Sequence, residues 1–87
     1  MLINIGGNIY LFKKDILGIF DFEEFTSSVE GRDFFRNLEK NKMLEIAEPE
    51  KIPQSVILCI DEFKNEKYYL SSISVSTLRK NQGGEYL

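Results

Sequence analysis

Basic side chains are the residues of this sequence best suited to bind a ligand, and they occur in four short groups. They are Lys13-Lys14, the helix-spaced Arg32, Arg36 and Lys40, the single Lys51, and Arg79-Lys80. Lysine and arginine contact the phosphates of nucleic acids, although an isolated surface charge usually contacts only solvent. Arg36 also has Asp33 and Glu39 within pairing distance on a helix. The groups indicate an anionic partner, with solvated surface charge as the alternative for each group alone.

Side chains for enzymatic catalysis are largely missing. The sequence contains no histidine, which excludes Ser-His-Asp and Cys-His nucleophilic catalysis. The single cysteine, Cys59, lies in an apolar run, where we expect a small buried hydrophobic side chain. The acidic residues that cluster early in the chain have no His or Cys beside them to complete a metal site; they are Asp15, Asp21, Glu23 and Glu24. We therefore predict no enzyme activity, no metal, no cofactor and no small-molecule substrate.

The overall charge and hydropathy restrict the class and location of the protein. Fourteen acidic residues against eleven basic ones give a net charge of −3. This balance argues against strong non-specific DNA binding but leaves room for a local basic patch. No apolar run approaches the roughly 18 residues of a membrane-spanning helix, and no signal-peptide pattern opens the chain. A lone cysteine fits a reducing compartment, so we predict a cytoplasmic protein without membrane contact.

Three apolar runs in the first 22 residues predict three strands, at 2–5, 9–12 and 16–22. Gly6-Gly7-Asn8 separates the first two runs and supplies the positive φ of a tight hairpin. A strand follows these glycines, which favours a hairpin turn over a phosphate-binding loop. The third run is rich in Ile and Phe, so we expect it to be buried on both faces. Together the runs predict a β-meander whose second connection is the basic corner Lys13-Lys14-Asp15.

The remainder of the chain predicts one main helix followed by further strands. A polar link at 23–28 leads to a helix at 29–41, which Ser27 and Glu30 open as a capping box. Short strands are expected at 43–46, 56–60 and 68–73, with 56–60 as the central one. Tyr68 and Tyr69 point to opposite faces of their strand, so one of them lies near a surface or an interface. A last helical turn at 77–80 is begun by Ser74 or Ser76.

These elements predict a single α+β domain. Residues 1–80 form a small antiparallel-rich sheet of about five or six strands with one main helix and a short C-terminal helical turn, and residues 81–87 form a flexible tail. The chain has 87 residues, of which seven are Phe and four are Tyr. A domain this small hides that much aromatic surface with difficulty, so we expect it to self-associate into a homo-oligomer.

Three segments give the sequence a family resemblance. INIGGNIYLFKKDILGIFD, PQSVILCI and YYLSSISVSTLRK resemble, in order and spacing, the small bacterial Rem family of extracellular-matrix regulators, and its RemB-like branch more than RemA. The similarity covers about residues 1–80. It implies a cytoplasmic protein of a Gram-positive bacterium that regulates the transcription of biofilm-matrix genes. It also implies a ring-shaped homo-oligomer that wraps or bends DNA.

The resemblance also implies where DNA would bind. Basic residues of the RemA branch lie just before the third strand and in the loop before the apolar central strand, which here are the Lys13-Lys14 corner and Lys51. An arginine of that pattern is replaced by Asp15, and the second member of an arginine pair by Ile52. The candidate DNA-binding residues are Lys13, Lys14, Lys51, Arg32 and Arg36. The alternative is an oligomeric protein-interaction module of the same fold that has lost DNA binding.

Overall fold

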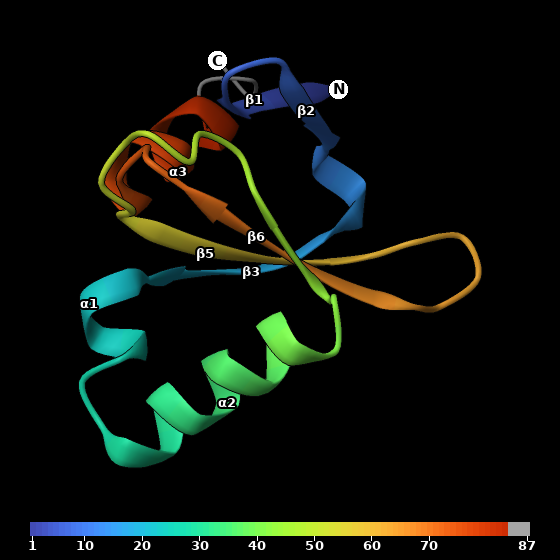
Figure 1. The fold of residues 1–87 in the computed structure, drawn as a ribbon. Helices are drawn as coiled ribbons and strands as arrows, with labels where there is room; N and C mark the ends of the chain where they lie inside the picture. The colour runs from blue at the N-terminus through green and yellow to red at the C-terminus, as the bar shows by residue number, and fades with distance from the viewer. Residues whose placement is uncertain (84–87) are drawn as a thin grey trace.

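A four-stranded sheet forms the middle layer of the protein, and the α+β class is confirmed (Figure 1). The computed structural model describes residues 1–83. The elements are β1 (Leu2–Gly6), β2 (Ile9–Phe12), the 3-10 turn η1 (Lys13–Asp15), β3 (Ile16–Asp21), α1 (Phe22–Phe25), α2 (Val29–Lys40), β4 (Leu44–Ile46), β5 (Ser55–Ile60), β6 (Glu66–Ser71) and α3 (Val75–Gly83). The sheet has the strand order β3-β5-β6-β4, and β1 and β2 form a separate two-stranded sheet.

Strand β5 is central in the sheet, as its continuous apolar run predicts. It pairs antiparallel with β3 on one side and with β6 on the other, the latter through a hairpin. Ile57 and Cys59 face one hydrophobic core, whereas Val56 belongs to a second core on the opposite face. Because both faces of β5 are covered, its side chains need not alternate between apolar and polar.

The β1–β2 hairpin and α3 cover the first face of the sheet. Ile3, Leu11 and Leu78 are buried there against β5. A bulge between Asn4 and Gly6 takes Ile5 out of the paired register. The buried hydroxyl of Ser71 on β6 donates a 2.6 Å hydrogen bond to the Ile5 carbonyl and accepts one from the Ile73 N–H. This hydrogen bond joins the hairpin to the sheet across most of the chain length.

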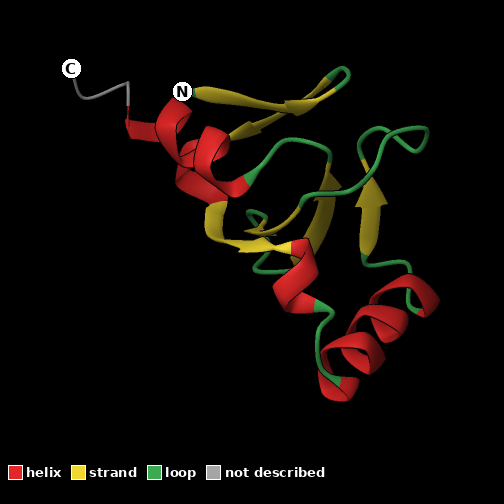
Figure 2. Cartoon of the chain, turned by 90° about the vertical axis from the view of Figure 1, so that its left-hand side faces the viewer, coloured by secondary structure: helices red, strands yellow, loops and turns green. Residues whose placement is uncertain are grey.

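Helices α1 and α2 lie on the opposite face, and Figures 1 and 2 both place them at the far end of the molecule from the β1–β2 hairpin. Leu38 is the buried residue of α2, and it packs with Tyr68 and Leu70 of β6. The predicted helix is confirmed, but Ser28 rather than Ser27 caps it by accepting a hydrogen bond from the Gly31 N–H. Tyr68 and Tyr69 face opposite cores, as the strand alternation predicts.

The predicted β-meander is wrong. Strand β3 does not pair with β2, because η1 redirects the chain from the two-stranded sheet to the edge of the four-stranded one. The expectation that 16–22 is buried on both faces is also wrong. Among its residues only Ile19 is buried, and Leu17 and Phe20 remain 56% and 41% exposed on an edge strand. Phe22 begins α1 instead of ending the strand, because Asp21 caps the Glu24 N–H.

The C-terminal helical element is longer than the predicted turn at 77–80. Helix α3 begins after Ser74, whose hydroxyl accepts a hydrogen bond from the Thr77 N–H at 3.2 Å. It continues to Gly83, so residues 81–83 of the predicted tail are helical and residues 84–87 lie outside the described part of the chain. None of the helices within residues 1–83 has the length and apolar character needed to span a membrane.

Candidate functional site

The Lys13-Lys14 corner is the 3-10 turn between the two sheets. The Lys13 backbone N–H donates a 2.9 Å hydrogen bond to the Met1 carbonyl, which ties the corner to the start of β1. Lys14 is exposed, and its Nζ lies 5.8 Å from the centre of the Phe12 ring. Asp15 is half-buried and lines a small cleft with Cys59 and Tyr69. The corner therefore presents lysine to solvent while its carboxylate lies beside the core.

Cys59 is a buried thiol, as the sequence predicts. Only 6% of the residue is exposed. Burial raises the pKa of its thiol to about 11, and the negative charge of Asp15 contributes to the increase. A thiol with such a pKa is protonated near neutral pH and is a poor nucleophile.

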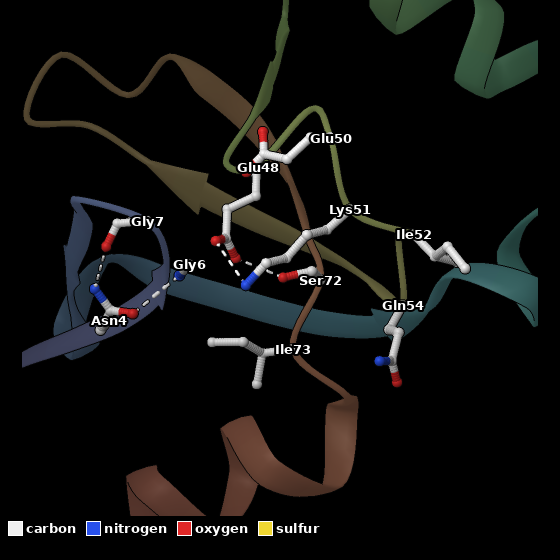
Figure 3. Close-up of a pocket in the computed structure, with 10 residues that line it drawn as sticks. All are labelled: Asn4, Gly6, Gly7, Glu48, Glu50, Lys51, Ile52, Gln54, Ser72 and Ile73. Carbon is white, nitrogen blue, oxygen red and sulfur yellow. Dashed lines mark hydrogen bonds and ion pairs between the residues drawn. The ribbon is translucent and has the colours of Figure 1, made fainter.

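Lys51 lies in a cleft of about 720 Å³ between the β4–β5 loop, the glycine turn and the end of β6 (Figure 3). Its Nζ forms a 3.1 Å ion pair with Glu48 Oε2. Glu48 also accepts a 2.6 Å hydrogen bond from the Ser72 hydroxyl. The Glu48 side chain is only 14% exposed, whereas Lys51 is 59% exposed. The positive charge of Lys51 is thus largely neutralised at its own loop.

Glu48 is a residue that the sequence analysis does not identify. Its carboxylate also accepts a hydrogen bond from the Gly7 N–H, so it joins the β4–β5 loop to the β1–β2 turn. A Cβ on Gly6 would lie 2.8 Å from Glu48 Oε1, and Gly6 and Gly7 both have positive φ. The two glycines therefore serve the turn and also admit the Glu48 carboxylate. The only hint in the sequence is the i,i+3 spacing of Glu48 and Lys51.

The pH dependence of stability tests the role of Glu48. The hydrogen bond from Ser72, and then the contact with Lys51, hold the pKa of Glu48 below the ordinary value of 4.5. A carboxylate whose pKa is lower in the folded protein than in the unfolded chain stabilises the fold at any pH above its unfolded pKa. This contribution is lost as the pH falls through the folded pKa. We expect Glu48→Gln to unfold at lower urea concentration than the wild type near neutral pH, and this difference to shrink in acid below about pH 4. The exposed Glu50→Gln is the matched control, and a difference that persists in acid would contradict the assignment.

Arg32 and Arg36, the two arginines of α2, have local structural partners. Arg32 donates hydrogen bonds from Nη1 to the carbonyls of Thr26 and Ser27, at 3.1 and 3.3 Å. It thereby closes the loop between α1 and α2. Arg36 forms the predicted i,i+3 ion pair with Asp33 at 3.2 Å, and both side chains are more than half exposed. A solvent-exposed pair of this kind contributes little stability and remains open to exchange for another anion.

The structure does not gather the five candidate residues into one patch on a single chain. Ile16 pairs with Cys59 and Asp21 pairs with Ser55, so η1 and the loop that carries Lys51 adjoin opposite ends of the β3–β5 ladder. Along β5 these ends are four residue steps apart, from Ser55 to Cys59, which is about 13 Å. Arg32 and Arg36 lie on the helix layer, on the other face of the sheet. One chain therefore offers separate small basic sites.

The negative charge of the protein is concentrated on the helix layer. Residues 20–34, from the end of β3 into α2, contain five of the fourteen acidic residues and one of the eleven basic residues. This segment has a net charge of −4, and the other 72 residues together have a net charge of +1. Arg36, Glu39 and Lys40 follow on the same helix, so residues 20–40 as a whole have a net charge of −3. The β1–β2 hairpin lies on the other side of the sheet from α1 and α2 (Figure 1).

Comparison with known proteins identifies no family. A scan against models of protein families finds no match, and a search of curated proteins finds none either. Within residues 1–83 no group of three or more His, Cys, Asp or Glu side chains is arranged to hold a metal ion.

Proposed function

We propose that the chain is a homo-oligomeric, DNA-binding regulator of the Rem type, acting in the cytoplasm of a Gram-positive bacterium on extracellular-matrix genes. The observation that carries this proposal is the position of the Lys13-Lys14 corner. It directly follows an exposed apolar strand face that is suited to self-association. The resemblance of the sequence to the Rem family supplies the gene class, and the geometry supports assembly and charge display.

The outer face of the β1–β2 hairpin supports self-association. Leu2 pairs across the strands with Phe12, and Asn4 pairs with Tyr10, while Ile3 and Leu11 face the core. Leu2, Tyr10 and Phe12 are each between 51% and 57% exposed. Contiguous apolar surface on a small soluble domain is a mark of an interaction site. We call Leu2, Tyr10 and Phe12 the hairpin face, and we assign to it a contact between copies of the chain.

Assembly would give the lysine corner the affinity that one chain lacks. Each chain contributes few phosphate contacts at Lys13 and Lys14, and each contact is weak and sensitive to salt. Rigid linkage of several such corners makes later contacts intramolecular and raises the overall affinity strongly. Five of the acidic residues lie in 20–34, outside the hairpin layer, so their repulsion of DNA phosphates acts mainly on the other side of the sheet. An acidic chain can therefore bind DNA through repeated corners.

A second candidate is an oligomeric protein-interaction module of the same fold that does not bind DNA. The ion pair of Lys51 with Glu48 and that of Arg36 with Asp33 favour this candidate, because they compensate two of the five candidate cations. Arg32 is likewise engaged by backbone carbonyls. The exposed Lys14 and its neighbour Lys13 are the residues through which the two candidates are tested.

A gel-shift titration with a mixed-sequence duplex separates the two candidates. We expect the wild-type oligomer to bind at low salt, and Lys13→Ala with Lys14→Ala to weaken binding by at least about tenfold and to flatten its salt dependence. The matched control, Lys40→Ala with Lys42→Ala, removes the same charge from the end of α2 on the other side of the sheet and is expected to bind almost as the wild type does. Sedimentation confirms that each variant is still assembled.

Two results would reject DNA binding at the corner. An intact wild-type oligomer that does not shift the duplex even at low salt would favour the interaction module. Equal weakening by the two double substitutions would show that only total charge matters.

A further inference from the structure

The helix layer exposes a row of aromatic rings that the proposed function does not use. The ring centres of Phe20 and Phe25 are 5.9 Å apart, as are those of Phe25 and Phe34. Phe34 is 45% exposed although it also touches Tyr68, and Phe20 is 41% exposed. From Phe20 to Phe34 the row spans at most about 12 Å, the sum of the two ring distances. Val29, 60% exposed at the start of α2, is a further exposed apolar side chain of this layer.

Carboxylates border this aromatic row. Asp21 and Glu24 line a cleft of about 520 Å³ together with Phe20 and Phe25, and Arg79 of α3 is the single cation among the lining residues. Further acidic side chains on the same segment are Glu23, Glu30 and Asp33. We call the row Phe20, Phe25 and Phe34, with the carboxylates of 21–30, the acidic aromatic face. Its apolar and negative character defines the chemistry of a partner.

We propose that the acidic aromatic face binds a basic amphipathic helix of another protein. Two turns of α-helix span about 10.8 Å, so apolar side chains at positions i, i+4 and i+7 match the length of the aromatic row. Lysine or arginine on the flanks of such a helix would meet the carboxylates, which complements the net charge of −4 on residues 20–34. This surface is distinct from the lysine corner and from the hairpin face.

A second copy of the chain fits this face less well. The exposed cations of α3, Arg79 and Lys80, adjoin Leu78, which is 1% exposed and packed in the core. Helix α3 therefore cannot present an apolar stripe and its basic residues together. Within residues 1–83, α2 carries exposed arginines, but it also carries acidic residues and forms the face itself. Another protein is thus the occupant that the charge pattern favours.

Fluorescence anisotropy with a synthetic helix tests the proposal. The probe is a labelled peptide of Leu and Lys with leucines at i, i+3, i+4 and i+7, and its controls are a Leu/Glu peptide and a shuffled Leu/Lys peptide. We expect the full chain to bind the probe at least about tenfold more tightly than either control. Phe34→Ser and, separately, Glu23→Lys with Glu24→Lys are each expected to weaken binding by at least about tenfold. The charge reversal alters exposed side chains only, so it keeps the test valid if Phe34→Ser unfolds.

Matched substitutions on the β5–β6 turn control for general hydrophobicity and charge. Phe63 is 74% exposed, and Glu62 and Glu66 are exposed on the same turn and strand. We expect Phe63→Ser, and Glu62→Lys with Glu66→Lys, to leave probe binding unchanged. Absence of binding, or equal losses in the control variants, would overturn the proposal. The proposal would also be overturned if the wild type sedimented as an oligomer and the Glu23→Lys, Glu24→Lys variant sedimented as a monomer. The face would then be a contact between copies of the chain.

Discussion

Replacing Tyr10 and Phe12 by serine is expected to convert the proposed homo-oligomer into folded monomers. Both side chains are more than half exposed on the outer side of the β1–β2 hairpin, so their loss removes little from the chain's own core. Full burial of a large apolar side chain contributes about 1.5–3 kcal/mol, and the exposed half of each ring accounts for about half of that. Loss of two at each contact raises the dissociation constant by at least about tenfold. Sedimentation velocity over a range of protein concentrations measures the change.

The control for this substitution is Phe63→Ser. Phe63 is 74% exposed, but it lies on the β5–β6 turn and is not part of the β1–β2 hairpin. We expect this variant to sediment like the wild type, and circular dichroism to show the same fold for all three proteins. If the variant with both substitutions remains assembled, the contact between copies must lie on another surface of the chain. A wild type that is monomeric at all concentrations would reject self-association itself.

Substituting alanine for Gly31 is expected to destabilise the protein by about 2 kcal/mol, although glycine to alanine in a helix ordinarily gains about 1 kcal/mol. A Cβ at position 31 would overlap the carbonyl oxygen of Phe25, which is the last residue of α1. Backbone cannot yield as a side-chain tip can, so α1 and α2 must separate. For a chain of this size the Tm falls by about 10 °C, measured by thermal unfolding.

Gly18→Ala provides the comparison for Gly31→Ala. Its added Cβ would lie 2.9 Å from Phe20 Cζ, the end of a partly exposed ring that can swing away. We expect a change within about 0.5 kcal/mol at this position. Similar losses at both glycines would show that the close approach of α1 to α2 has no special cost. A Gly31→Ala protein as stable as the wild type would contradict the packing described for these two helices.

The proposed sites occupy different layers, which allows them to act together. The hairpin face and the lysine corner belong to the side of the sheet covered by β1, β2 and α3, whereas the acidic aromatic face lies mainly with α1 and α2, and its cleft reaches Arg79 of α3. Figure 2 shows the two layers on opposite sides of the sheet. An assembly built through the hairpin would therefore keep the second surface accessible. A basic partner helix could then join a DNA-bound oligomer without competing for the lysines.

Local patterns predicted the elements that depend on local physics. The apolar spacing and a serine cap predicted α2 to within one or two residues, and the apolar run at 56–60 predicted the central strand β5. Cys59 as a buried thiol and the Arg36–Asp33 pair followed from strand position and helix spacing. Each of these depends on residues close together in the chain.

Pairing between distant segments could not be read in the same way. The Ile- and Phe-rich run of β3 suggested burial on both faces, but hydrophobicity does not reveal whether another strand or helix will cover a given side. The structure places β3 at the sheet edge, where Leu17 and Phe20 stay exposed. Only the order of the strands in the sheet shows that these two side chains belong to the surface.

The sequence by itself determined the α+β class, the main helix, the central strand and the residues able to carry positive charge. The tertiary structure alone decided that Lys51 is paired with Glu48, that the lysine corner and Lys51 lie at opposite ends of β3–β5, and that the arginines of α2 lie on the other face of the sheet from the hairpin. Local conformation follows from side-chain sterics and periodicity over a few residues. Proximity of groups such as Ser71 and Ile5 depends on long-range packing, whose free energy is shared among many contacts and is absent from any short segment.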